Sequence, residues 1–142
     1  MSAYVDSSFL VSSYIPDAHS PSVDQRLAGA PRIYLTPLNR AELAHAINQQ
    51  VFLKRIPRSQ LQLAWSDFER DCSAGLWIRV EFPHSAWETS TGLARRYCPT
   101  LGVRTLDSLH VACALELKAE RFWTFDERQA RLAEAVGLDT SP

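Results

Sequence analysis

The spacing of hydrophobic positions predicts short strands and helices that alternate along the chain. Short β-prone apolar runs are separated by longer stretches in which apolar residues recur with the helical period. The predicted strands are residues 3–5, 33–35, 76–80 and 122–125. The predicted helices are residues 9–14, 22–27, 37–56, 59–74, 83–97, 104–117 and 127–136.

Cap and turn residues define the ends of these helices. Thr36 followed by Pro37 is an N-cap with a proline at the first helical position, and Gly75 and Gly137 follow helices as C-terminal glycines. Residues 98–102, which contain a proline and a glycine, are predicted to form a loop.

Regular alternation of strands and helices, without internal repeats, predicts the α/β class. Parallel strands need helical connections, and these cover both faces of the sheet. We therefore expect one domain over residues 1–142, a three-layer α/β/α sandwich with a central, mostly parallel sheet of four or five strands. A fifth strand could only be the short stretch 138–140.

The stretch 104–117 is predicted to be an interior helix, because apolar residues occupy most of its circumference. A carboxylate near the start of such a helix, here Asp107, is costly to keep charged without compensation. A local explanation is available. Thr105 can act as the N-cap, which places Asp107 in the first turn, and His110 lies one turn further on, within side-chain reach.

Four acidic residues are predicted to converge at one rim of the sheet. Asp6 and Asp126 follow predicted strands, and ligands of open parallel sheets bind outside the carboxyl ends of the strands. Glu42 and Asp107 lie near helix N-termini that connections of ordinary length could bring to the same rim. Converging carboxylates stay ionised only when cations neutralise them, and oxygen ligands favour Mg²⁺ or Mn²⁺. The chemistry indicated is metal-assisted hydrolysis of a phosphate ester.

Each of these acids also has a purely structural interpretation. Asp126, with Gln129 three residues later, forms a capping box for the last helix. Asp6 could be an ordinary turn residue, and Glu42 could face solvent. No single position decides between the two interpretations.

Other catalytic signals are missing from the sequence. Four histidines share no common spacing and are expected to lie on the surface or to make local hydrogen bonds: His19, His45, His84 and His110. Ser7 and Ser8 lack the surroundings of a serine-hydrolase nucleophile, and there is no glycine-rich phosphate loop.

The charge balance excludes a generally basic nucleic-acid binder. The chain has 15 Lys and Arg against 16 Asp and Glu, a net charge of -1. Small basic clusters could contact a phosphate backbone or simply be solvated: Lys54, Arg55 and Arg58, and separately Arg95 and Arg96. Three cysteines without zinc-like spacing indicate reduced thiols, and no apolar run approaches the roughly 20 residues of a membrane span. We expect a soluble, cytoplasmic protein without membrane contact.

Four motifs in this order resemble the PIN domain family, and specifically the VapC ribonuclease toxins of type II toxin-antitoxin systems. The motifs are Tyr4-Val5-Asp6-Ser7-Ser8, Asn39-Arg40-Ala41-Glu42-Leu43, Arg104 to Ala112 with Asp107 and His110, and Thr124-Phe125-Asp126. Ser7 stands where the family often has threonine. The resemblance covers nearly the whole chain.

The resemblance implies an endoribonuclease that depends on Mg²⁺ or Mn²⁺ and cleaves tRNA or rRNA. It implies the metal ligands Asp6, Glu42, Asp107 and Asp126, with Ser8 and Thr105 as secondary or positioning residues. It also implies a homodimer and a VapB-type antitoxin that masks the acidic crevice.

Two other functions are considered. One is a PIN-like interaction module without catalysis, which the presence of all four acids disfavours. The other is a small phosphatase with Asp6 as a covalent nucleophile, which needs a second acid two residues later, where this chain has Ser8.

Overall fold

The computed structural model describes residues 1–142 and contains a four-stranded, wholly parallel sheet. Its strands are β1 (Ser2–Val5), β2 (Arg32–Leu35), β3 (Trp77–Arg79) and β4 (Arg121–Trp123), in the order β3-β2-β1-β4. Each neighbouring pair is parallel, with Tyr4 opposite Tyr34 on one side and Phe122 on the other. The predicted α/β class with a parallel sheet is confirmed.

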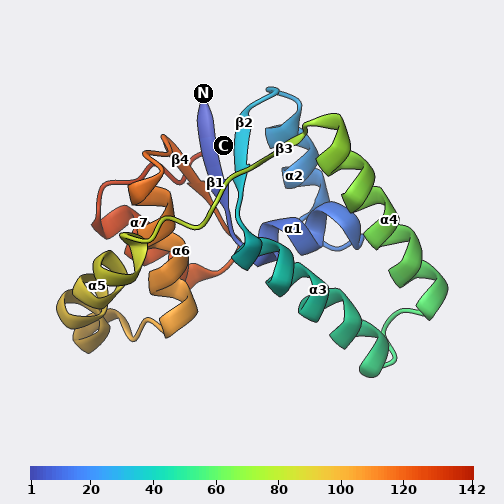
Figure 1. Ribbon diagram of the computed structural model, residues 1–142. Helices are drawn as coiled ribbons and strands as arrows, with labels where there is room; N and C mark the ends of the chain where they lie inside the picture. The colour runs from blue at the N-terminus through green and yellow to red at the C-terminus, as the bar shows by residue number, and fades with distance from the viewer.

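Seven helices cover the two faces of this sheet (Figure 1). They are α1 (Ser7–Tyr14), α2 (Ser20–Leu27), α3 (Pro37–Phe52), α4 (Arg58–Ala74), α5 (Ala86–Leu101), α6 (Thr105–Glu116) and α7 (Glu127–Ala135). Helices α1 to α4 lie on one side and α5 to α7 on the other, which makes the three-layer sandwich that the sequence predicts (Figure 1).

Alternation along the strands divides the core into two apolar clusters. Ala3 and Val5 of β1 belong to the cluster under α1 to α4, whereas Tyr4 between them belongs to the cluster under α5 to α7. In β4, Trp123 and Phe122 divide in the same way. Since successive side chains of a strand point to opposite faces, a strand buried on both sides is apolar throughout.

Helix α6 is interior, as predicted. Eight consecutive residues, from Asp107 to Ala114, are buried. The last four of them, Val111 to Ala114, belong to the second core cluster. A polar residue in this segment is therefore cut off from bulk water and needs a protein partner.

The two edge strands, β3 and β4, are shorter than predicted. The third strand is Trp77–Arg79 rather than 76–80, and the fourth begins at Arg121 and ends before Thr124. The stretch 138–140 contributes an isolated parallel bridge between Asp139 and Arg121, in which the Phe122 N–H donates to the Asp139 carbonyl at 2.9 Å.

The prediction of a loop at residues 98–102 is wrong, because α5 continues through Pro99 to Leu101. A proline in the last turn has a backbone angle that suits a helix and removes one hydrogen bond, here to the carbonyl of Arg95. Arg95 is exposed, so water can satisfy that carbonyl. The helix ends at Gly102, which takes a left-handed conformation with φ of 64°.

Helix α3 buries residues at intervals of four positions. The buried residues are Asn39, Leu43 and Ile47, and Ala41 is exposed. Asn39 is polar but fully buried, because its amide donates to the Val5 carbonyl at 2.8 Å and ties α3 to the end of β1. None of the helices combines the length and the apolar composition needed to cross a membrane.

Candidate active site

The candidate site lies where the chain order of the sheet reverses. From β1 the chain proceeds to β2 and β3 on one side, and it returns with β4 on the other side of β1. The carboxyl ends of β1 and β4 therefore form a topological switch point, which is where open α/β sheets bind ligands.

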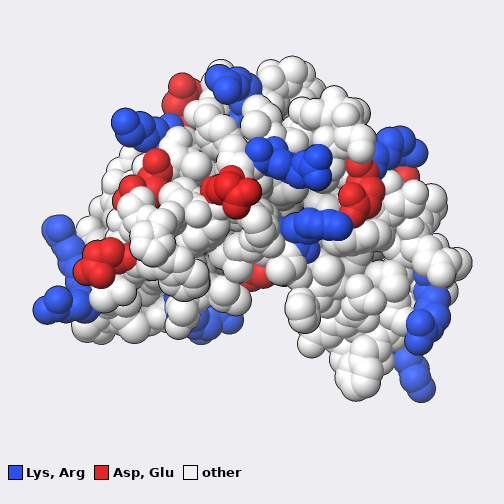
Figure 2. Space-filling model, viewed as in Figure 1, with Lys and Arg blue, Asp and Glu red and all other residues white.

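A cavity of about 760 Å³ opens at this point. All six residues predicted for the site line it: Asp6, Ser8, Glu42, Thr105, Asp107 and Asp126. The space-filling view shows a notch between the two helical layers on this side of the molecule (Figure 2). One wall follows α3 through Glu42, Ala46 and Gln50, which share a helix face at intervals of four residues.

Asp6 is the N-cap of α1 at the end of β1. Its Oδ1 accepts hydrogen bonds from the Phe9 N–H at 3.2 Å and the Ser8 hydroxyl at 2.7 Å. Its Oδ2 accepts from the Thr124 hydroxyl at 2.8 Å. These donors fix the orientation of both carboxylate oxygens.

Burial nevertheless dominates the protonation of Asp6. The residue is only 1% exposed, and desolvation raises the pKa of its carboxyl above the ordinary value of 3.8. The hydrogen bonds from the Ser8 and Thr124 hydroxyls and from the Phe9 N–H act in the opposite direction without cancelling the effect. A cation in the cavity would favour the ionised form of Asp6.

Asp107 is held at the start of α6 by a cap that differs from the predicted one. Arg104, not Thr105, is the N-cap, and Thr105 is the first helical residue. The Arg104 backbone N–H donates to Asp107 Oδ2 at 2.8 Å, and the Arg104 Nε donates to the same oxygen at 3.2 Å. The acid at the third helical position closes the capping interaction, so the side chain of Thr105 is not needed for it.

Arg104 also connects Asp107 to Asp126. Its terminal nitrogen donates to Asp126 Oδ2 at 3.1 Å. The other Asp126 oxygen caps α7 and accepts from the N–H groups of Arg128 and Gln129. The reciprocal half of the predicted capping box is not formed, because the Asp126 N–H donates to the Thr124 hydroxyl and the Gln129 side-chain oxygen has no partner. The two acids raise the pKa of the Arg104 guanidinium, through the hydrogen bond to Asp107 first and through the charges of Asp107 and Asp126 next.

The predicted contact between His110 and Asp107 is not formed. His110 is fully buried and pairs through Nε2 with the Glu42 carboxylate from α3. Its Nδ1 lies 2.8 Å from the Tyr4 hydroxyl. Residues i and i+3 of α6 can share a face, but the space beside His110 is taken by β1 and α3, which supply its partners.

The hydrogen bonds around His110 form a directed chain. The Asn39 amide donates to the Tyr4 hydroxyl at 3.3 Å, which leaves the Tyr4 proton for His110 Nδ1. Nε2 then donates to Glu42, because a carboxylate can only accept. Burial raises the pKa of Tyr4 well above its ordinary value of 10.0, which keeps the hydroxyl protonated. The chain holds Glu42 at the cavity wall.

The donor set suits a hard divalent cation in type but not in spacing. Carboxylate oxygens are what Mg²⁺ and Mn²⁺ prefer, and five carboxylates line the cavity with a single arginine and no lysine. However, no group of three or more acidic, histidine or cysteine side chains is close enough to hold one ion. Glu42 is engaged by His110, and Asp107 and Asp126 are engaged by Arg104.

Sequence reasoning missed several residues of the site. Thr124 binds Asp6, and Arg104 binds two of the acids, although both lie within the motifs. Arg104 stands three residues before Asp107, a spacing that allows an ion pair at a helix start. His19 stacks on Phe125 at 4.2 Å between ring centroids in the same cavity, and nothing in the sequence indicated that contact.

The family model of the PIN domain matches residues 3–135. This chain belongs to the PIN domain family. The matched range includes every acid of the cavity. No curated protein sequence matches the chain significantly.

Solved structures show the same fold at low sequence identity. VapC20 of Mycobacterium tuberculosis, a toxin that cleaves the sarcin–ricin loop, is 15% identical, with a TM-score of 0.70 and 98% of each chain covered. VapBC2 of Rickettsia felis, bound to a DNA fragment from its promoter, is 16% identical, with a TM-score of 0.67 over 99% of this chain and 98% of that one. FitAcB of Neisseria gonorrhoeae is 16% identical, with a TM-score of 0.66 and 93% of each chain covered.

Proposed function

We propose that this PIN domain is the ribonuclease toxin of a toxin-antitoxin pair and cleaves RNA with the help of Mg²⁺ or Mn²⁺. The observation that carries the proposal is the convergence of Asp6, Glu42, Asp107 and Asp126 on one cavity at the switch point of the sheet. The fold is shared with toxins, one of which cleaves ribosomal RNA at the sarcin–ricin loop.

The four acids would hold the cation, and the other residues of the cavity would orient them. The chemistry that a divalent cation supplies in such a site is polarisation of a water and neutralisation of phosphate charge. Ser8 and Thr124 keep both oxygens of Asp6 in place through their hydroxyl donors. His110 does the same for Glu42 from the interior.

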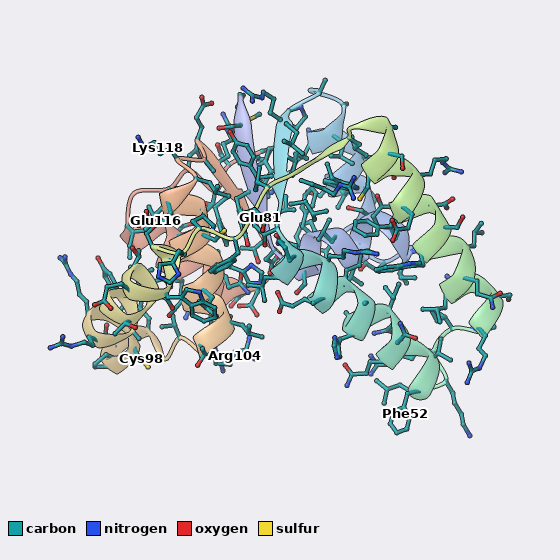
Figure 3. The ribbon with its side chains drawn as sticks, viewed as in Figure 1. Phe52, Glu81, Cys98, Arg104, Glu116 and Lys118 are labelled. Atoms are coloured by element: carbon teal, nitrogen blue, oxygen red, sulfur yellow. The ribbon has the colours of Figure 1, made fainter.

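A basic surface of the protein lies beyond the acidic cavity and would contact the RNA backbone. The wall formed by α3 leads from Glu42 past Gln50 to the turn before α4. Lys54 and Arg55 in this turn and Arg58 at the start of α4 are exposed and form no ion pair with an acid of the chain. Phe52 in Figure 3 marks this end of α3 and projects from the molecule. Unpaired cations at the end of the cavity would bind phosphates that flank the scissile one.

Cleavage of total cellular RNA by the purified protein tests the proposal. Discrete fragments are expected with Mg²⁺ or Mn²⁺ and not with EDTA, and none from Asp107→Asn. Asp24→Asn is the matched control, because Asp24 is exposed on α2 outside the cavity. Loss of cleavage in both variants, or cleavage that survives EDTA and Asp107→Asn, would contradict the assignment.

The toxin part of the proposal has its own test. Induced expression of the wild type is expected to arrest bacterial growth, and expression of Asp107→Asn to leave growth unchanged. Binding to a VapB-type antitoxin and formation of a homodimer belong to the same proposal, and two of the structurally similar proteins are toxin-antitoxin assemblies. Growth arrest by both forms would separate toxicity from cleavage and overturn this part.

A further inference from the structure

We propose that Arg104 is a built-in counter-ion of the cavity, which a divalent cation must displace before it can bind Asp107 and Asp126. This inference rests on the proposed metal dependence and adds a positioning residue to it. The observation behind it is a single guanidinium that bridges two of the acids proposed to bind metal.

The Arg104 side chain bridges acids from two elements of the fold. Asp107 belongs to the first turn of α6 and Asp126 to the cap of α7, and the Arg104 side chain joins them with donors at 3.2 and 3.1 Å. Each acid thereby offers one oxygen to the arginine, Oδ2 in both cases. An ion that takes these oxygens has to remove the guanidinium first.

No other lysine or arginine of the cavity can neutralise these acids. Among the residues that line it, five are acidic and Arg104 is the only lysine or arginine. Burying Asp107, which is 1% exposed, next to further carboxylates is unfavourable without a nearby positive charge. Arg104 supplies that charge in the form of the protein that holds no metal.

The side chain of Arg104 can also move away from the two acids. Its side chain is 61% exposed, whereas that of Asp107 is 1% exposed. The backbone N–H of Arg104 still holds Asp107 at 2.8 Å when the side chain turns away, so the acid keeps its position. Figure 3 shows Arg104 at the N-terminal end of α6, beside the opening between the helical layers.

Exchange of one cation for another explains why the acids lie in one cavity without forming a metal cluster. The Arg104 guanidinium contacts Oδ2 of both Asp107 and Asp126, and no group of three or more acidic, histidine or cysteine side chains is placed to hold one ion. With Arg104 displaced, the same two carboxylates can approach a divalent cation, and the released guanidinium faces the cavity where the RNA phosphate would lie.

Binding of Mn²⁺ alone to the full chain tests the exchange, measured by calorimetry and by electron paramagnetic resonance of the bound ion. We expect Arg104→Gln to bind Mn²⁺ about tenfold more tightly than the wild type. If Arg104 bridges the two acids in about ten wild-type molecules for each one in which it has turned away, the apparent Mn²⁺ affinity falls by about that factor. Arg104→Lys, which keeps the charge but loses the fork that reaches both acids, is expected to lie between them.

Arg128→Gln is the matched control. Arg128 is exposed on the first turn of α7, forms no ion pair and does not line the cavity, so its removal changes the net charge equally. Equal tightening in both variants would mean that only long-range charge acts, and would overturn the exchange. Weaker binding to Arg104→Gln would overturn it as well, since Arg104 would then support the metal site.

Thermal unfolding gives a second readout. In EDTA, Arg104→Gln is expected to melt below the wild type, because Asp107 and Asp126 lose their counter-ion. Mn²⁺ should raise the melting temperature more in the variant than in the wild type; an equal rise contradicts the proposal. If neither protein binds Mn²⁺ and neither cleaves RNA, both the exchange and the proposed function are wrong. If the wild type binds Mn²⁺ and cleaves RNA but Arg104→Gln binds Mn²⁺ no more tightly, only the exchange is wrong.

Discussion

The two walls of the cavity hold their carboxylates in different ways. On the α6 and α7 wall, Asp107 and Asp126 depend on helix caps and on the exposed side chain of Arg104. On the α3 wall, Glu42 depends on His110, which is fully buried and anchored to Tyr4. One wall therefore carries an exchangeable cation, and the other a fixed hydrogen-bond donor that is part of the core.

The difference shows how one site combines stability with adaptability. A buried polar chain such as Asn39–Tyr4–His110–Glu42 is worth most when every member is satisfied, and it is costly to interrupt. The Arg104 guanidinium is largely exposed, so breaking its ion pairs costs less than interrupting the buried chain. Changes to the buried chain behind the α3 wall should therefore affect folding more than changes to Arg104 on the α6 wall do.

The largest expected effect is on cleavage. Asp107→Asn keeps the shape and the hydrogen bond from the Arg104 backbone but removes the charge, and should lower RNA cleavage by about a thousandfold. Initial rates on an end-labelled fragment, with unfolding curves of both proteins, measure this. A drop of less than tenfold with the fold intact would remove Asp107 from the chemistry.

The next effect is on stability. His110→Ala leaves the Tyr4 hydroxyl and the Glu42 carboxylate without their partner, and opens a cavity in the core. The expected loss is about 3 kcal/mol in the free energy of unfolding, measured in urea. His84→Ala, at a more exposed histidine outside the cavity, should change it by less than about 0.5 kcal/mol. Equal losses would refute the difference between the walls.

The pH dependence of stability tests the burial of Asp6. Because its folded pKa is raised above 3.8, the cost of burying its charge is present above that raised pKa and is relieved as the pH falls through it. In EDTA at neutral pH, Asp6→Asn should therefore melt a few degrees above the wild type. The gap should close as the pH falls through the raised pKa toward 3.8, and a constant gap would contradict this cause.

The smallest effect concerns RNA binding at the far end of the α3 wall. Replacing Lys54, Arg55 and Arg58 by glutamine should weaken binding of RNA to the Asp107→Asn protein about tenfold at low salt, with a shallower salt dependence. Fluorescence anisotropy measures both quantities. Arg95→Gln with Arg96→Gln, on α5, is the comparison, and an equal loss there would mean that overall charge alone attracts RNA.

The sequence determined the fold class, the order of the elements and the acids that share one cavity. Apolar strands, helical periodicity and cap residues are local patterns, so they could be interpreted without the structure. Asp6 follows β1 directly and Asp126 lies three residues after the end of β4, and the carboxyl ends of parallel strands meet at one edge. The end of α5 was misjudged because a proline in a last turn removes only one hydrogen bond, here from Arg95, which is an exposed residue.

Only the tertiary structure decided what each acid binds. The partners of Glu42 and Asp126 come from segments 68 and 22 residues away, and no local pattern encodes such contacts. His110 could equally have faced Asp107 by helical spacing, but packing of α6 against β1 and α3 gave it Tyr4 and Glu42. Local propensities depend on a residue and its neighbours in sequence, whereas the pairing of charges in a cavity depends on which elements the core brings together.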